Sequence, residues 1–114
     1  MRPKTPKTLE DIRDAAAFIR QVTVEKTLDQ YRTDRLLRQA VERNFEIVGE
    51  AVKRLSETDP EVVSLIDGYK QIIAFRNILI HGYDLIDDEQ VWRVVQNDLP
   101  TLIDTVRKLR FEGD

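Results

Sequence analysis

The chain contains no cysteine, which excludes a disulfide framework, a thiolate nucleophile and a Cys-ligated zinc site. Only one histidine, His81, occurs among the 114 residues, so the acid–base chemistry available to a single chain is narrow. The absence of cysteine fits a reducing compartment, and we expect a cytoplasmic protein.

Long apolar runs are also missing, and no segment has the roughly 20 apolar residues that a membrane-spanning helix needs. The basic start, Met1–Lys4, leads into no apolar stretch of the kind found in secretory signals. Glycine and proline occur four times each, too few for the many tight turns of a β-sandwich. Good helix formers dominate the remainder. The sequence therefore predicts an all-α protein, with a single domain over residues 1–114.

An excess of positive charge is absent, because the net charge is −3 and the pI is near 5.2. A binder of duplex DNA that ignores base sequence needs a basic field, so we exclude that class. The chain has a cluster of arginines and a cluster of acidic residues, and we interpret both as solvated surface. The acidic cluster lacks recognisable ligand spacing, so no metal site is predicted there. The two clusters are Arg32, Arg35, Arg38 and Arg43, and Asp84, Asp87, Asp88 and Glu89.

Capping residues predict the first three helical segments. Thr8-Leu9-Glu10-Asp11 resembles a capping box, so the first helix is predicted to begin at Thr8. Thr27 is expected to cap a short turn that includes Tyr31. Asp34 is a good N-cap for a long amphipathic helix that should end near Ser56–Asp59.

The second half of the chain predicts two further helices after a short one. Asp59-Pro60 is typical of a cap followed by proline at the first helical position, and Asp67-Gly68 should end that short helix. The next helix is predicted from Tyr69 to about His81, with Gly82 as a left-handed residue after it. The last helix should begin at Asp87 or Asp88, with a kink at Pro100. We therefore predict a four- to five-helix antiparallel bundle.

Three features of these helices allow more than one interpretation. Gly49 lies inside the long helix, where glycine costs about 1 kcal/mol relative to alanine, so we expect another helix to approach closely there. Glu46 and Glu50 lie one turn apart; they either orient Arg76, pair across a dimer, or pair with nearby basic residues on their own helix. Trp92 is expected in the core or at an interface.

His81 and its neighbours are the main candidates for chemistry. On an ideal helix Asn77 and His81 share a face, whereas Arg76 and His81 are about 140° apart. Arg76 and His81 would therefore converge only if the helix ends at His81 or if a second copy of the chain faces the first.

The segment Arg76-Asn77-Ile78-Leu79-Ile80-His81-Gly82-Tyr83 resembles the motif of the HEPN superfamily, specifically of the HepT-like toxins of prokaryotic toxin–antitoxin pairs. That motif is Arg, four to six residues, then His, with Tyr two residues later in the HepT-like form. The resemblance covers roughly residues 8–110. One departure is Asp67-Gly68-Tyr69, where relatives often have Ile-Pro-Trp. The resemblance also extends to Ala40-Val41-Glu42-Arg43, Ile47-Val48-Gly49-Glu50-Ala51, Val91-Trp92 and Asn97-Asp98-Leu99-Pro100.

The resemblance implies a metal-independent endoribonuclease that acts as a homodimer, with Arg76 and His81 as catalytic residues, Asn77 as a supporting polar residue, and no cofactor. The chemistry agrees, because cleavage through the RNA 2′-hydroxyl needs a base, an acid and positive charge on the phosphate. One histidine cannot readily serve as both acid and base, whereas two facing copies supply two.

Tyr83 has three interpretations. It is a core or interface aromatic, it stacks on a base of single-stranded RNA, or, as the resemblance implies, it is the residue to which a partner nucleotidyltransferase antitoxin attaches AMP. Such a nucleotide would add negative charge where RNA phosphate must bind, and would thereby silence the toxin.

An alternative class of function is a non-catalytic helical subunit that docks on a minimal nucleotidyltransferase and positions its substrate. The acidic pI favours this alternative, and the intact Arg76–His81 pair favours the enzyme.

Overall fold

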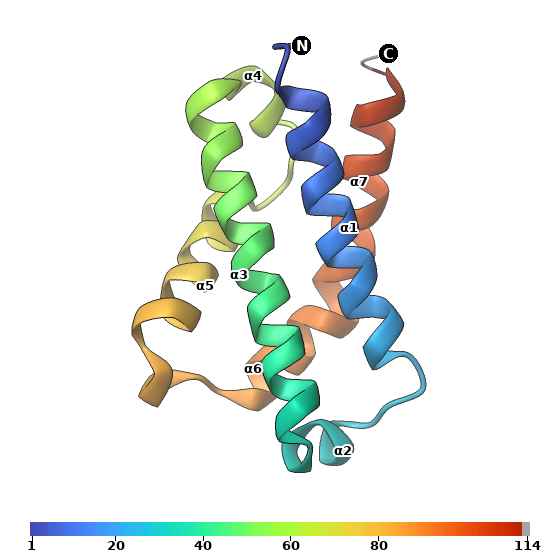
Figure 1. The fold of residues 1–114 in the computed structure, drawn as a ribbon, viewed down its shortest axis with the longest axis vertical. Coiled ribbons are helices and arrows are strands. Elements are labelled where there is room, and N and C mark those ends of the chain that lie inside the picture. Colours follow the sequence, from blue (N-terminus) through green and yellow to red (C-terminus); the bar gives the residue numbers. More distant parts are fainter. Residues whose placement is uncertain (113–114) are drawn as a thin grey trace.

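The computed structural model describes residues 1–112, and the elements in that range are all helical. Three long helices, α1 (Thr5–Thr23), α3 (Arg35–Thr58) and α5 (Tyr69–His81), pack with a composite last helix into an antiparallel bundle (Figure 1). The predicted all-α fold is therefore confirmed. The last helix consists of α6 (Asp88–Arg93), η2 (Val94–Asp98) and α7 (Leu99–Glu112), and the short segments are α2 (Leu28–Thr33), α4 (Pro60–Val63) and η1 (Tyr83–Leu85).

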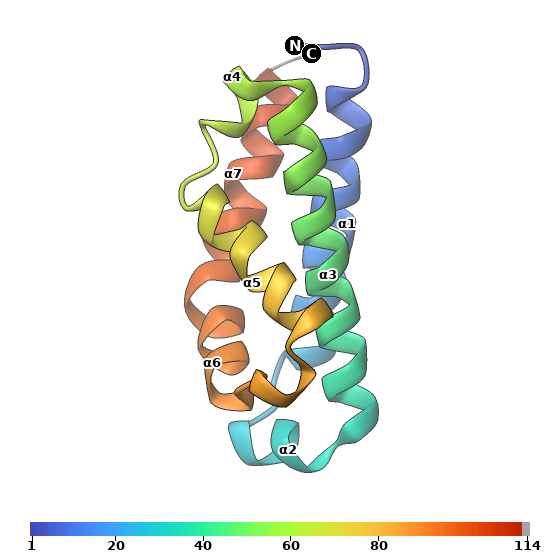
Figure 2. The same ribbon diagram turned by 90° about the vertical axis from the view of Figure 1, so that its left-hand side faces the viewer.

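The core lies where α3 packs between α1 and α5, and where α1 in turn packs against α7 (Figures 1 and 2). Apolar residues at helical spacing point into it from α1 and α3, as the sequence periodicity predicts. No helix in residues 1–112 combines the length and the apolar character needed to cross a bilayer. The fully buried core side chains include Leu9, Ile12 and Ile19 of α1, Val41, Val52 and Leu55 of α3, and Val106 of α7.

Most predicted helix starts are confirmed by side-chain caps. Thr27 forms a full capping box with Gln30, and the Asp34 carboxylate accepts a hydrogen bond from the Leu37 N–H at 3.0 Å. Asp59 caps α4 in the same way, and α5 spans Tyr69–His81 as predicted. Local capping chemistry therefore determines where these helices begin.

The predicted start of the first helix at Thr8 is wrong, because α1 begins at Thr5. Pro6 lies in the first turn, where a missing N–H costs nothing. The Thr8 side chain does not cap the helix but is buried inside it, and its hydroxyl donates to the Lys4 carbonyl at 3.1 Å. The sequence thus contains the capping-box pattern, but the helix does not use it, because α1 begins three residues before Thr8.

The prediction that Gly82 is left-handed is also wrong, because its φ is −117°. The chain does not reverse after His81 but continues into the 3-10 turn η1, with the Leu85 N–H donating to the Gly82 carbonyl at 2.6 Å. Gly82 is instead held in a confined space, since an added Cβ would lie 3.2 Å from the Ile78 carbonyl oxygen.

The last helix continues past Pro100, as predicted, and the adjustment takes the form of the π-helical segment η2 just before it. A proline inside a helix lacks an N–H and its ring conflicts with the carbonyl four residues earlier. Here that carbonyl belongs to Gln96, which lies within η2, so the wider turn accommodates the proline ring. Figure 1 shows α6 running obliquely below the more upright α7.

Candidate active site

Helix α5 carries the Arg76–His81 motif and is only partly covered by its own chain. Apolar residues occur on all its sides, yet Leu79 is its one fully buried residue. Gly68 starts the helix with a φ of +74°, and an added Cβ would meet nothing closer than 3.7 Å, so the left-handed backbone rather than space requires glycine there. This turn contains Asp67-Gly68-Tyr69, the segment whose sequence departs from the HepT-like pattern.

The side chain of Arg76, a residue of α5, packs against α3 at Gly49. A Cβ added to Gly49 would overlap the Cβ of Arg76 and would lie 2.6 Å from its Cγ. The predicted close approach at Gly49 is therefore confirmed, and the approaching group is the aliphatic stem of Arg76. Beyond this stem the Nη1 atom donates to the Asn77 Oδ1 atom at 2.9 Å, while the Nε atom is buried without a partner in the described chain.

His81 is the last residue of α5 and is exposed to solvent. The helix is regular up to that point, so the expected angle of about 140° between Arg76 and His81 applies. Within residues 1–112 no hydrogen bond joins the two side chains, and one chain alone does not bring them together on one face. Helix α5 ends at His81, as predicted, but this end does not bring the Arg76 and His81 side chains together.

Tyr83 follows in η1, and 84% of its surface is exposed. The interpretation of Tyr83 as a core aromatic is therefore wrong, and the interface, RNA-stacking and modification interpretations still apply. The exposure has a simple cause: the 3-10 turn after Gly82 carries the chain away from α5 before α6 begins.

Glu46 and Glu50 have ordinary partners on α3. Glu46 lies 3.4 Å from an Arg43 nitrogen, and Glu50 lies 3.8 Å from an Arg54 nitrogen. No ion pair joins either carboxylate to Arg76 in the described part of the chain. The structure thus favours the interpretation of both as partners of neighbouring basic residues.

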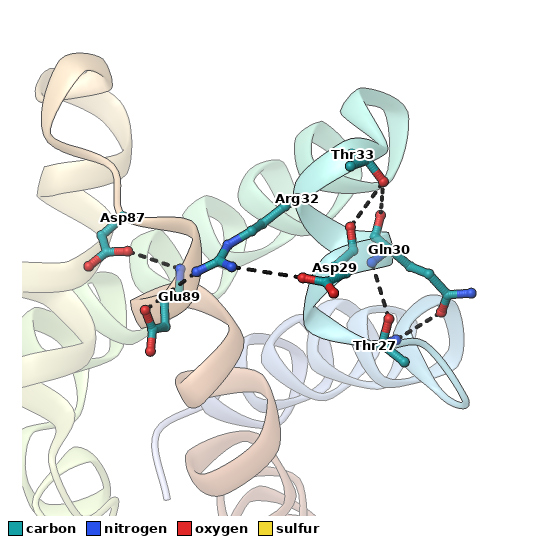
Figure 3. Close-up of polar contacts among 7 residues, drawn as sticks. All are labelled: Thr27, Asp29, Gln30, Arg32, Thr33, Asp87 and Glu89. Atoms are coloured by element: carbon teal, nitrogen blue, oxygen red, sulfur yellow. Dashed lines mark hydrogen bonds and ion pairs between the residues drawn. The ribbon is translucent and has the colours of Figure 1, made fainter.

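The clusters of arginine and acidic residues lie at the surface, as predicted, but they also face each other. Arg32 on α2 lies 3.4 Å from Glu89 on α6 (Figure 3). Arg38 on α3 lies 4.0 Å from Asp88. Surface pairs of this kind contribute about 0–1 kcal/mol each. Among residues 1–112 no three acidic or histidine side chains are grouped so that they could hold a metal ion.

A buried polar group that sequence reasoning missed lies beside these pairs. Tyr31 is fully buried, its hydroxyl has no hydrogen-bond partner among residues 1–112, and its ring lies 5.4 Å from that of Trp92. Burial, with Glu42 and Asp88 nearby, raises the pKa of the Tyr31 phenol, and burial likewise raises the pKa of the Glu42 carboxyl. Trp92 is half-buried against the core, as predicted.

An apolar groove of about 530 Å³ separates α5 from the last helix, and none of the motif residues from Arg76 to Tyr83 lines it. No sequence pattern predicts this groove, because it arises from the spacing between helices that are distant in the chain. Its apolar lining includes Phe45, Val48, Ile72, Phe75, Val94 and Leu102.

Comparison with known proteins gives the family. The model of the family described as "Ribonuclease HepT-like" matches residues 12–109. The chain belongs to the HepT-like ribonuclease family. A relative from Thermococcus cleftensis, named "Probable ribonuclease HepT", is 32% identical over 106 residues, which cover 90% of this chain and 92% of the relative. The HepT-like resemblance inferred from the motif is thereby confirmed.

Another relative is longer than this chain. A protein of Methanocaldococcus jannaschii, named "Gamma-glutamylcyclotransferase and putative RNase", is 34% identical over the whole chain, which spans 51% of that relative. No solved structure matches this HepT-like chain. Family membership links the chain to ribonucleases.

Proposed function

We propose that this HepT-like chain is a metal-independent endoribonuclease that cuts RNA with Arg76 and His81 in a cleft formed by two copies. The observation that carries the proposal is the arrangement of α5: Arg76 is held against α3 at Gly49, and His81 is exposed about 1.4 turns further on. An anchored guanidinium and an accessible imidazole are the two groups that RNA cleavage through a 2′-hydroxyl requires.

In the proposed reaction one His81 takes the proton of the RNA 2′-hydroxyl, and the resulting oxygen attacks the adjacent phosphorus. The bond from phosphorus to the 5′-oxygen breaks, and that oxygen receives a proton from the second His81. The products are a 2′,3′-cyclic phosphate and a free 5′-hydroxyl. Arg76 stabilises the charge on the phosphate, because its planar set of donors matches the phosphate oxygens.

Two features of the chain support a second copy. One copy supplies a single histidine, and its Arg76 and His81 point in directions about 140° apart. The surface around the motif is also apolar, with Ile78 and Ile80 each 38% exposed and Leu85 72% exposed. A symmetric pair would cover these side chains and place two motifs in one cleft.

The test of catalysis is RNA cleavage by the purified protein. Arg76→Ala and His81→Ala should each reduce the cleavage rate by about 10²–10⁴-fold while the circular dichroism spectrum stays unchanged, because each removes a group used in the transition state. Chelator should leave the wild-type rate intact, and RNA with 2′-O-methyl groups should resist cleavage. Cleavage by His81→Ala at the wild-type rate would rule out this mechanism.

We further propose that the chain is the toxin of a toxin–antitoxin pair, silenced when a cognate nucleotidyltransferase attaches AMP to Tyr83. The exposure of Tyr83, two residues beyond His81, supports this, because an accessible phenol can be reached by another enzyme. Expression of the chain alone should arrest growth, and His81→Ala should remove that effect.

A second candidate function is a non-catalytic subunit that docks on a nucleotidyltransferase. One observation favours it: the net charge is −3, which gives the chain no basic field to attract RNA. In that case His81→Ala would leave the biological activity unchanged, whereas the endoribonuclease would lose it.

A further inference from the structure

Gly49 is the residue on which Arg76 rests, and it is buried in the middle of α3. Its backbone φ lies in the ordinary helical range, so left-handed geometry does not explain a glycine at this position. In a helix interior glycine costs about 1 kcal/mol relative to alanine. The contact with Arg76 supplies a reason for that cost, because only a residue without a side chain leaves room for the arginine stem.

The atom of Arg76 that would collide with a Gly49 side chain is its Cβ, which is attached directly to the backbone of α5. A change of rotamer moves the outer atoms of an arginine, but it cannot move the Cβ. Carbon atoms pack at about 3.5–4.0 Å, so a methyl group at position 49 would require α5 to shift by about 1.5 Å. The Ile72 carbonyl oxygen of the same helix lies 3.4 Å from the added Cβ, so α5 packs closely against Gly49 at two points.

Beyond this contact the guanidinium of Arg76 makes one hydrogen bond within residues 1–112. Its Nε atom is buried against the protein, and its Nη1 atom donates to Asn77 Oδ1 at 2.9 Å. Gly49 therefore determines how deep the stem lies, and Asn77 determines the orientation of the guanidinium head. A charged group held in this way is preorganised for a phosphate.

We infer that Gly49 is a positioning residue for the proposed reaction: it sets the depth at which Arg76 presents its guanidinium to RNA phosphate. This inference rests on the proposed role of Arg76. A displacement of about 1 Å at a reacting group can lower a rate by about 100-fold, so the depth of the contact matters for chemistry as well as for packing.

The first experiment measures the contact itself by thermal unfolding. Gly49→Ala should lower the melting temperature of the wild-type chain by about 5 °C. In an Arg76→Gly background, which removes the Cβ and Cγ atoms, the same change should raise it, since alanine is the better helix former. If Gly49→Ala changed the melting temperature equally in both backgrounds, the inferred contact between Gly49 and Arg76 would be contradicted.

The second experiment measures function at a temperature at which every variant is folded. Gly49→Ala should reduce the cleavage rate at saturating RNA by about 100-fold. It should also weaken binding of a 2′-O-methyl RNA, in the same direction as Arg76→Ala does. The matched control is Ile12→Ala, which opens the core on α1 away from α5 and should leave RNA binding and the rate per folded molecule within about twofold.

The outcomes separate this inference from the proposed function. If the wild type cuts RNA and folded Gly49→Ala cuts at the same rate, the positioning role is overturned while the endoribonuclease proposal stands. If the wild type binds RNA without cutting it, the endoribonuclease proposal fails, and 2′-O-methyl RNA binding decides the inference. Weakened binding by Gly49→Ala then supports it, and unchanged binding overturns it.

Discussion

At the scale of single residues, Arg76 and Tyr83 lie in opposite environments although only seven positions separate them. Arg76 is half-buried with its stem against the α3 backbone, whereas Tyr83 is 84% exposed on a 3-10 turn. The first environment suits a group that must hold one position during a reaction. The second suits a group that another protein must reach.

The proposed modification of Tyr83 leads to a prediction at this scale. Co-expression with the cognate nucleotidyltransferase should add the mass of AMP to the chain and suppress RNA cleavage, because the new phosphate would compete with RNA for Arg76. Tyr83→Phe should escape modification and keep most of the activity, since the proposed chemistry uses no phenol. Intact-mass spectrometry decides this: an equal adduct on Tyr83→Phe, or none on the wild type, would contradict the regulation.

At the scale of secondary-structure elements, one buried carboxylate joins the start of the chain to the end of α3. Asp59 caps α4, accepts the Thr5 hydroxyl at 2.7 Å, and accepts the Arg2 backbone N–H at 3.1 Å. The Thr5 hydroxyl, with help from the Arg2 and Val62 backbone N–H groups, holds the pKa of Asp59 below its ordinary value. The early start of α1 at Thr5 thus has a tertiary cause as well as a local one.

This lowered pKa predicts how stability depends on pH. The folded Asp59 binds its proton less readily than the unfolded one. Its contribution to the free energy of unfolding is therefore fully present at pH values above the unfolded pKa of about 3.9. The contribution is lost as the pH falls through the lower folded pKa. Urea unfolding at a series of pH values should show a smaller acid-dependent loss for Asp59→Asn and for Thr5→Val than for the wild type.

The exposed acid Asp104 on α7 provides the control for that measurement. Asp104→Asn should reproduce the wild-type dependence of stability on pH, because no hydrogen bond or ion pair reaches this carboxylate within residues 1–112. An identical pH profile for Asp59→Asn and the wild type would show that the contacts around Asp59 do not contribute to the dependence of stability on pH.

At the scale of the whole molecule, the chain is thin: its shortest dimension is 19 Å, about two helix diameters. In so thin a bundle α5 is covered on one side by α3, and its apolar residues on other sides remain partly exposed. A second copy packed near α5 would complete both the packing and the proposed site.

The proposed dimer predicts that an inactive chain suppresses an active one. When the wild-type chain exchanges subunits with an excess of His81→Ala, the cleavage rate per wild-type chain should fall severalfold, because a mixed dimer contains one histidine where the proposed reaction uses two. Light scattering at micromolar concentration should give twice the mass of one chain. A fully active monomer would contradict the composite cleft.

The sequence by itself determined the helical class and most helix starts, because these depend on local chemistry. Asp34, Asp59 and the Thr27–Gln30 pair cap the helices that follow them, as their side chains predict. The family was also readable from the sequence, since the spacing from Arg76 to Tyr83 is a property of the chain and not of its folding.

Only the tertiary structure decided which residue each of these groups meets. That Gly49 accommodates Arg76, that Thr5 binds Asp59, and that Arg32 pairs with Glu89 depends on contacts between helices distant in sequence. The conformation of Gly82 was likewise decided by the turn that leads to α6 rather than by the preference of glycine. Periodicity specifies which face of a helix is buried, but the partner on that face depends on how the whole bundle packs.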